Sequence, residues 1–178
     1  AQFGLHRVLV LPAGRHPFKG EQHNAPADAR LALCRLAFLE LPYVDVDDRE
    51  LSPASTGYTV DTLHALRKEF GAAVGLYFLI GSDNVRDLPQ WRAHHEALAL
   101  AQFVIVPRAG LPVSERTFDG LDLTGAEKAS LLAHVARVTP SDLSSTEVRR
   151  RLRAGEDATD LLAPSVLREI RRRGLYHT

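Results

Sequence analysis

Short apolar runs that end in Gly or Pro alternate along this chain with segments of helical periodicity, and this alternation most constrains the fold. RVLVLPAG (residues 7–14) and GLYFLIGSD (residues 75–83) are typical of buried strands that lead into turns. Between such runs, apolar residues recur every three to four positions, as on one face of a helix. Strands that alternate with helices predict a parallel sheet with right-handed crossovers. We therefore expect an α/β fold whose ligands bind beyond the carboxyl ends of the strands.

The elements expected on this basis run the length of the chain. Strands are predicted at residues 7–14, 43–48, 75–83, 101–110 and 134–140. Helices are predicted at 27–41, from Ser55 or Thr59 to Gly71, around Leu98 and Leu100, from Ser144 onward, and at 164–173. Residues 111–122 are expected to form a loop.

Size and charge narrow the class of protein. A chain of 178 residues is most economically a single domain, 1–178. Lys and Arg number 22, as do Asp and Glu, which argues against a basic nucleic-acid-binding protein. The single cysteine, Cys34, excludes a disulfide framework, and its apolar surroundings predict a buried thiol. With no apolar run of about 20 residues and no signal peptide, we expect a cytoplasmic protein without a membrane span.

The stretch DLSSTEVRRRLRAG (residues 142–155) places hydroxyl groups before a helix whose first turns are rich in arginine. Ser144 and Glu147 have the spacing of a capping box, which is worth about 1 kcal/mol and requires no ligand. Arginine near a helix start opposes the macrodipole, however, and a bound anion would resolve that conflict. The residues alone leave both a plain helix start and a phosphate site open.

Four further residues allow a structural and a functional interpretation each. Lys19 follows a strand and is either an exposed loop lysine or a phosphate contact. Asp83, after Gly81, either caps the next helix or accepts from ribose hydroxyl groups. Trp91 either packs a loop onto the body or stacks on an aromatic ligand. Thr59 is either a helix cap or a ligand contact.

Several common site types are not supported by the sequence. It contains no P-loop, no Gly-x-Gly-x-x-Gly and no Gly-x-Ser-x-Gly motif. The eight histidines show no spacing typical of metal ligands. The adjacent His94 and His95 are expected to point in different directions on a helix.

Taken in order, seven fragments resemble the bacterial nicotinate-mononucleotide adenylyltransferases of the nucleotidylyltransferase superfamily. They are VLVLPAG-x4-K, VDDREL, YTVDTL, LYFLIGSDNVRDLPQW, FVIVPRAG, DLSSTEVRRRL and IRRRGLY. The resemblance runs from about Phe3 to Tyr176, and the ordered set is far more specific than any one fragment. It implies a Rossmann-like nucleotidyltransferase fold, with a parallel sheet flanked by helices.

The resemblance also implies roles for individual residues. The substrate-binding residues would be Lys19, at the phosphate of the mononucleotide, and Thr59 and Trp91, at the pyridine ring. Arg149, with the adjacent hydroxyl groups, would bind the triphosphate and act in catalysis. The residues implied for ATP binding are Gly81, Asp83, Val106, Pro107, Arg108, Ser144, Ser145, Thr146 and Arg149.

The implied reaction is attack of the mononucleotide phosphate on the α-phosphorus of ATP, giving deamido-NAD and pyrophosphate. Mg²⁺ would accompany ATP, and no protein metal ligand is implied. The expected partners are ATP and nicotinate mononucleotide, without nucleic acid or membrane, and a homo-oligomer is allowed. The alternatives are a non-catalytic nucleotide-binding module of the same fold, or a relative acting on nicotinamide mononucleotide or phosphopantetheine.

Two departures from the family pattern concern the first part of the chain. Where the family commonly has Pro-Pro-His-Lys, this sequence has HPFK at residues 16–19. The chain lacks the family's His-x-Gly-His motif and contains no methionine, even at position 1. We therefore expect that a strand and helix of about 25–30 residues precede Ala1 in the complete protein. Residues 1–178 alone are expected to be poorly stable and nearly inactive.

Overall fold

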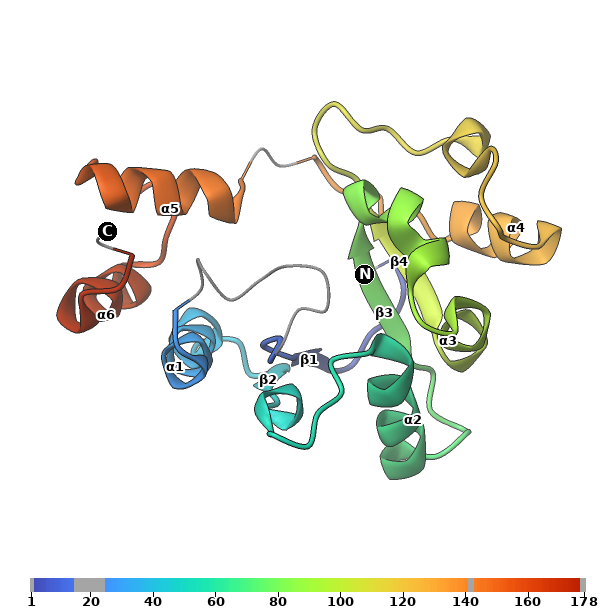
Figure 1. Cartoon of the computed structure of the whole chain (residues 1–178), viewed down its shortest axis with the longest axis horizontal. Helices are drawn as coiled ribbons and strands as arrows, with labels where there is room; N and C mark the ends of the chain where they lie inside the picture. Colours follow the sequence, from blue (N-terminus) through green and yellow to red (C-terminus); the bar gives the residue numbers. More distant parts are fainter. Residues whose placement is uncertain (1, 15–24, 141–142, 177–178) are drawn as a thin grey trace. The chain divides into compact units, whose positions relative to one another are not determined.

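Parallel pairing of short apolar strands occurs in both parts of this chain, as the sequence predicts. The computed structural model describes residues 2–14, 25–140 and 143–176. It divides into two units, which are described separately below (Figure 1). Unit 1 comprises Phe3–Gly57 and Leu143–Thr178, and unit 2 comprises Tyr58–Asp142 together with Gln2.

Unit 1 begins with a parallel strand pair and its crossover helix. Strand β1 (Val8–Val10) pairs with β2 (Val44–Val46), with Val8 opposite Val44. Helix α1 (Ala27–Phe38) makes the crossover between the two strands. It ends three residues earlier than the predicted helix at 27–41. The turn after β1 meets a short 3₁₀-helix, η2 (Arg49–Leu51). A Cβ at Gly14 would lie 1.9 Å from the carbonyl oxygen of Glu50, so this close approach requires glycine.

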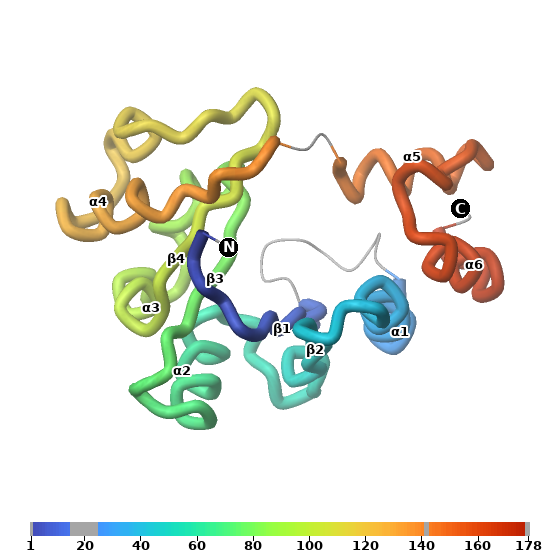
Figure 2. Tube along the Cα trace, turned by 180° about the vertical axis from the view of Figure 1, so that it is seen from behind, coloured from blue at the N-terminus to red at the C-terminus, as the bar shows by residue number. Residues whose placement is uncertain are grey.

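The rest of unit 1 is a helical layer. Helices α5 (Ser145–Ala154) and α6 (Pro164–Arg173) bury a shared apolar cluster. Helix α6 packs against α1, and the two lie side by side in Figures 1 and 2. An ion pair from Arg173 to Asp28, at 2.8 Å, joins the same two helices. The buried members of the cluster are Leu152, Ala158, Val166, Leu167 and Ile170.

Unit 2 is built on a second parallel strand pair, β3 (Tyr77–Gly81) and β4 (Gln102–Val106). Its helices are α2 (Thr59–Phe70), α3 (His94–Leu100) and α4 (Gly125–Ala133), with the 3₁₀-helices η3 (Ser82–Gln90) and η4 (Glu115–Phe118). The apolar positions of the predicted second helix are confirmed as its inner face, since Val60, Leu63 and Leu66 are all buried. Among the described residues, no helix is long and apolar enough to cross a membrane.

The strand predicted at residues 134–140 is only partly formed. Val135 makes a single parallel bridge to Ile105 of β4. On the other side, the side chain of Gln2 donates to the carbonyl oxygen of Val135 and accepts from the amide of Arg137. The Gln2 carboxamide thus occupies the hydrogen-bonding positions on the edge away from β4, where a further strand would pair.

Candidate functional site

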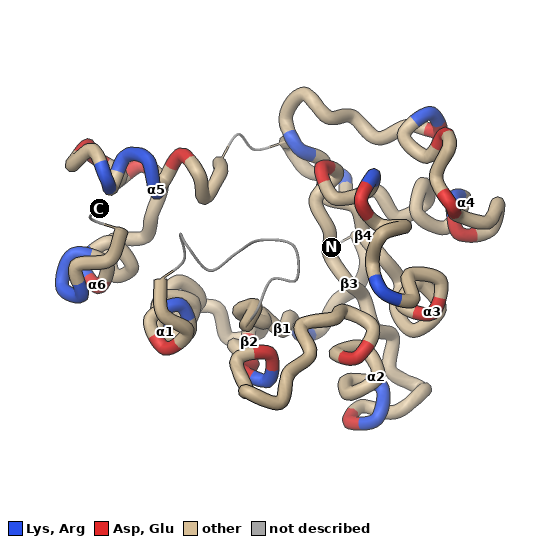
Figure 3. Tube along the Cα trace, viewed as in Figure 1, with Lys and Arg blue, Asp and Glu red and all other residues tan. Residues whose placement is uncertain are grey.

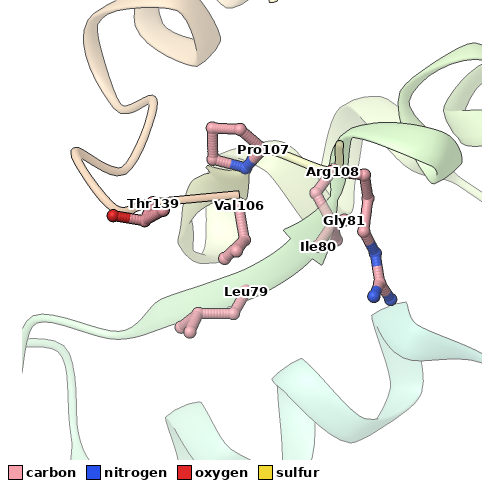
Figure 4. Close-up of a pocket in the computed structure, with 7 residues that line it drawn as sticks. All are labelled: Leu79, Ile80, Gly81, Val106, Pro107, Arg108 and Thr139. Atoms are coloured by element: carbon pink, nitrogen blue, oxygen red, sulfur yellow. The ribbon is translucent and has the colours of Figure 1, made fainter. Parts of the chain in front are cut away.

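A cavity of about 310 Å³ lies at the carboxyl ends of β3 and β4 in unit 2. Figure 4 shows its lining side chains around the two strand ends. Four of the residues predicted to bind ATP are among them, namely Gly81, Val106, Pro107 and Arg108. The others are Leu79, Ile80 and Thr139. The position agrees with the rule that ligands bind beyond the carboxyl ends of parallel strands.

Asp83 lies beside this cavity and contacts Arg108. The Asp83 Oδ1 is 3.5 Å from the Arg108 Nε, and both side chains are about half exposed. A Cβ at residue 81 would lie 2.1 Å from Asp83 Oδ1, so a side chain at this position would displace the carboxylate. The cap of η3 is Gly81 rather than Asp83, so the capping interpretation of Asp83 is wrong. Its carboxylate is therefore held at the cavity as an exposed acceptor.

The hydroxyl of Ser82 joins the two strand ends. It is buried and accepts a hydrogen bond of 2.9 Å from the amide of Arg108. This contact fixes the turn after β4 against the turn after β3, and so fixes the mouth of the cavity. Thr139 and Leu79 were not predicted as site residues. The position of Thr139 at the carboxyl end of the last predicted strand was the available signal.

The start of α5, in unit 1, bears out half of the predicted capping box. The Ser144 hydroxyl accepts from the amide of Glu147 at 3.1 Å. Glu147 does not complete the box. Its carboxylate instead accepts from Arg150 and Arg151, and these hydrogen bonds lower the pKa of Glu147 to about 2.

The arginines of α5 fall into two groups, those paired with acids and those not paired. Figure 3 shows that basic and acidic residues both occur along this helix. Arg150 and Arg151 are paired with acids, Arg150 with Glu156 and Arg151 with Asp160, as well as with Glu147. Within the described part of the chain, Arg149 makes no such pair. Arg149 follows Ser145 and Thr146 by four and three positions, so the three side chains share one face of the helix. That face carries a guanidinium whose charge no acid of the described chain offsets.

Thr59 and Trp91 are brought towards each other in unit 2 by their neighbours. The Arg92 guanidinium lies 4.8 Å from the centre of the Tyr58 ring and 3.6 Å from an Asp61 carboxylate oxygen. Tyr58, not Thr59, is the cap of α2, so the capping interpretation of Thr59 is wrong.

The Trp91 ring is partly exposed and packs against two phenylalanines. Its centre lies 6.2 Å from that of Phe78, edge to face, and 6.4 Å from that of Phe103. The packing interpretation of Trp91 is therefore confirmed. A role in stacking on a ligand stays a prediction, as does a role for Lys19, which lies outside the described residues.

The expectation that His94 and His95 point in different directions is wrong. The rings of His94 and His95 are 4.0 Å apart, and both approach Asp122. One ligand atom from each of the three residues lies within 4.8 Å of the others. None of these three residues is among those that line the cavity at the strand ends. Cys34, the other candidate for metal or nucleophile chemistry, is partly buried, and burial raises the pKa of its thiol.

Comparison with known proteins gives matches along nearly the whole chain. The Cytidylyltransferase-like family profile matches residues 1–151. The probable nicotinate-nucleotide adenylyltransferase of Dehalococcoides mccartyi is 34% identical over 178 residues, covering 99% of this chain and 85% of that protein. The corresponding protein of Serratia proteamaculans is 34% identical over 186 residues, covering 99% of this chain and 84% of that protein.

A solved structure gives the same result for the fold. It is the Plasmodium falciparum nicotinic acid mononucleotide adenylyltransferase complexed with NaAD, with a TM-score of 0.74 at 18% identity. The match covers 97% of this chain and 83% of that one. The predicted Rossmann-like nucleotidyltransferase fold is thus confirmed. The relatives are 34% identical and their alignments cover 99% of this chain. The chain therefore belongs to the nicotinate-nucleotide adenylyltransferases, an enzyme family with a cytidylyltransferase-like domain.

Proposed function

We propose that this protein transfers the adenylyl group of ATP to nicotinate mononucleotide, giving deamido-NAD and pyrophosphate in NAD biosynthesis. The named relatives support this reaction. The structural observation that carries the assignment is the cavity at the ends of β3 and β4, because four residues expected at ATP line it. The remaining roles are proposed from the chemistry of each group of residues.

The adenosine of ATP occupies the cavity of unit 2 in this proposal. Leu79 and Val106 supply apolar surface for a flat base, and Gly81 lets a ligand approach the backbone closely. The exposed Asp83 carboxylate is an acceptor that suits ribose hydroxyl groups. Pro107 and Arg108 bound the same cavity.

The triphosphate binds at the start of α5. Ser144, Ser145 and Thr146 are exposed there, at a helix end whose free amides favour anions. Arg149 adds a charge that acids of the described chain do not offset, whereas Arg150 and Arg151 are already engaged by acids. Charge-assisted hydrogen bonds from a guanidinium are well suited to phosphate.

The mononucleotide binds through Thr59, Trp91 and Lys19. The partly exposed Trp91 ring is a surface on which a pyridine ring can stack. Lys19 is proposed to meet the phosphate of the mononucleotide, on the basis of the family resemblance alone.

Mg²⁺ fits the residues at the start of α5 as an ion that arrives with ATP. Glu147 is held by two arginines, so its carboxylate is not offered to a metal, while hydroxyl groups and phosphate oxygens are hard ligands that Mg²⁺ accepts. When bound, Mg²⁺ supplies positive charge to the phosphate oxygens. We further propose that the protein is cytoplasmic and has no nucleic-acid or membrane partner. The proposal is compatible with a homo-oligomer.

Catalysis in this proposal rests on positioning and charge. The mononucleotide phosphate is already a nucleophile, so the protein forms no covalent intermediate. Holding both substrates in line lowers the entropic part of the barrier. Arg149 and the hydroxyl groups at the start of α5 stabilise negative charge that develops on the phosphates and on departing pyrophosphate.

The proposal is tested by measuring pyrophosphate release by the full-length protein with ATP and each of two mononucleotides. We expect kcat/KM for nicotinate mononucleotide to exceed that for the nicotinamide form. Omitting the mononucleotide should abolish the signal. A clear preference for the amide would assign the chain to the sister activity, and turnover with neither would contradict the proposal.

A further inference from the structure

The histidine cluster of unit 2 has no part in the proposed adenylyl transfer. His94 and His95 begin α3, and Asp122 lies in the loop before α4. The His94 side chain is only 10% exposed, although it is polar, whereas that of Asp122 is 80% exposed. The residue before them, Ala93, has a left-handed conformation with φ of 49°. Both imidazole rings therefore start from an unusual backbone turn and lie together.

Three possible ligand atoms in this cluster face one another. Asp122 Oδ2 is 4.0 Å from Nε2 of His94 and 3.9 Å from Nε2 of His95. Ligands about 2.0–2.1 Å from a tetrahedral metal lie roughly 3.4 Å apart. A shift of about half an ångström in the exposed Asp122 side chain would therefore bring its oxygen into range.

Glu127 acts as an outer partner that orients His95. It forms the capping box of α4, because its Oε2 accepts from the amide of Thr124 at 2.7 Å. Its other oxygen, Oε1, contacts Nδ1 of His95 at 2.8 Å. A carboxylate on one imidazole nitrogen is the usual arrangement behind a metal-binding histidine, since it leaves the other nitrogen facing the metal. Here that other nitrogen is the one that faces Asp122.

The charges in this cluster also favour a cation. Asp122 and Glu127 contribute two carboxylates beside two imidazoles. Two nitrogen ligands and one oxygen suit Zn²⁺, whereas Mg²⁺ prefers oxygen ligands and retains several waters.

We propose that His94, His95 and Asp122 form a Zn²⁺ site, in which Glu127 orients His95 and water completes a tetrahedral shell. His94 Nε2 donates to the carbonyl oxygen of Asp122 at 2.9 Å, so binding replaces one hydrogen bond. The proton moves to Nδ1 of His94, and the lone pair of Nε2 is offered to the metal. The site ties the loop that contains Asp122 to α3, and bound Zn²⁺ stabilises the fold by mass action.

The test is a Zn²⁺ titration of the full-length protein, after dialysis against a chelator, in competition with a chromophoric indicator. We expect saturation at one equivalent and at least a tenfold loss of affinity in His95→Ala and in Asp122→Asn. Glu127→Gln, which retains capping ability, should also weaken binding by about tenfold or more. The two exposed positions are used because His94 is buried and its loss could disturb folding.

A matched control is His64→Ala. His64 Nε2 contacts Glu96 at 2.8 Å on the surface of unit 2, so it is a histidine–glutamate pair outside the cluster. Its loss should leave Zn²⁺ affinity unchanged, and Zn²⁺ should raise the Tm of this variant and of the wild type but not that of His95→Ala. Millimolar Mg²⁺ should not displace Zn²⁺. Equal binding by wild type and His95→Ala, or an equal loss in His64→Ala, would overturn the proposal.

Discussion

Trp91 shows how one side chain can serve packing and a ligand at once. Its ring system packs against Phe78 and Phe103, and the residue remains partly exposed. The next residue, Arg92, contacts Tyr58 at the start of α2, where Thr59 lies. These contacts give the tryptophan a defined orientation before any substrate binds, which reduces the entropy lost on binding.

Replacing Trp91 by Ala should raise KM for nicotinate mononucleotide while changing KM for ATP much less. A lost stacking contact of about 1 kcal/mol corresponds to about fivefold in KM. Steady-state kinetics with each substrate varied in turn would measure both constants. Phe78→Leu is the matched control, because it loosens the same aromatic cluster without removing the proposed stacking surface. Equal effects of the two variants on both substrates would give Trp91 a purely structural role.

The histidine cluster illustrates what could not be predicted at this scale. Sequence periodicity places neighbouring residues on different helix faces, so His94 and His95 were expected to diverge. They come together at the first turn of α3, directly after a left-handed Ala93. Asp122 reaches them only through tertiary folding, and a single sequence has no signal for that contact.

The helix α5 shows how far an element can be predicted. The start, the cap and the arginines of the helix can be predicted from DLSSTEVRRRLRAG, but the hydrogen-bond partners of the Glu147 carboxylate cannot. A carboxylate at this position can close the capping box or bind arginine, and two arginines one turn further on outweigh one backbone amide.

Elements with a clear period and a stop signal were predicted best. The helix at 164–173 has the predicted bounds, and the one ending before Gly71 begins at Thr59, one of the two predicted starts. Helix α4 was missed although Thr124 and Glu127 have the same capping spacing as the start of α5. The strand at 134–140 was overestimated, since only Val135 bridges to Ile105 of β4, and on its other edge a glutamine side chain takes the hydrogen bonds, which no local pattern reveals.

Ser144→Ala should destabilise the protein by about 1 kcal/mol through loss of the cap on α5. Ser145→Ala is the matched control, because Ser145 lies inside the helix, where alanine is favoured. Urea unfolding would measure both free energies. Both variants are expected to lose adenylyl transfer, since both hydroxyl groups are proposed to contact the triphosphate. Equal stability of the two variants would contradict the capping role of Ser144.

On the scale of the whole molecule, unit 1 is assembled from both ends of the chain. Its two segments, Phe3–Gly57 and Leu143–Thr178, are joined through all of unit 2. A folded unit 2 fixes the ends of that long connection, and so reduces the entropy that unit 1 loses on folding. We therefore retain the prediction that residues 1–178 form a single domain.

Differential scanning calorimetry tests this prediction on the full-length protein. A single domain should give one transition, with equal calorimetric and van't Hoff enthalpies. Residues 1–178 should contribute an enthalpy of about 120 kcal/mol near 60 °C. Two separate transitions would show that the units unfold independently.

The most direct test of the proposed function compares Arg149→Ala with Arg153→Ala in the pyrophosphate-release assay. The two arginines lie four positions apart on the same face of one helix, but Arg153 lies one turn further from the hydroxyl groups at the helix start. If Arg149 stabilises the charge on the phosphates, its loss should lower kcat/KM by about 10²–10³. Loss of Arg153 should change kcat/KM by about twofold or less, as expected for an exposed charge screened by salt. Equal losses in the two variants, or unchanged turnover in Arg149→Ala, would contradict the account.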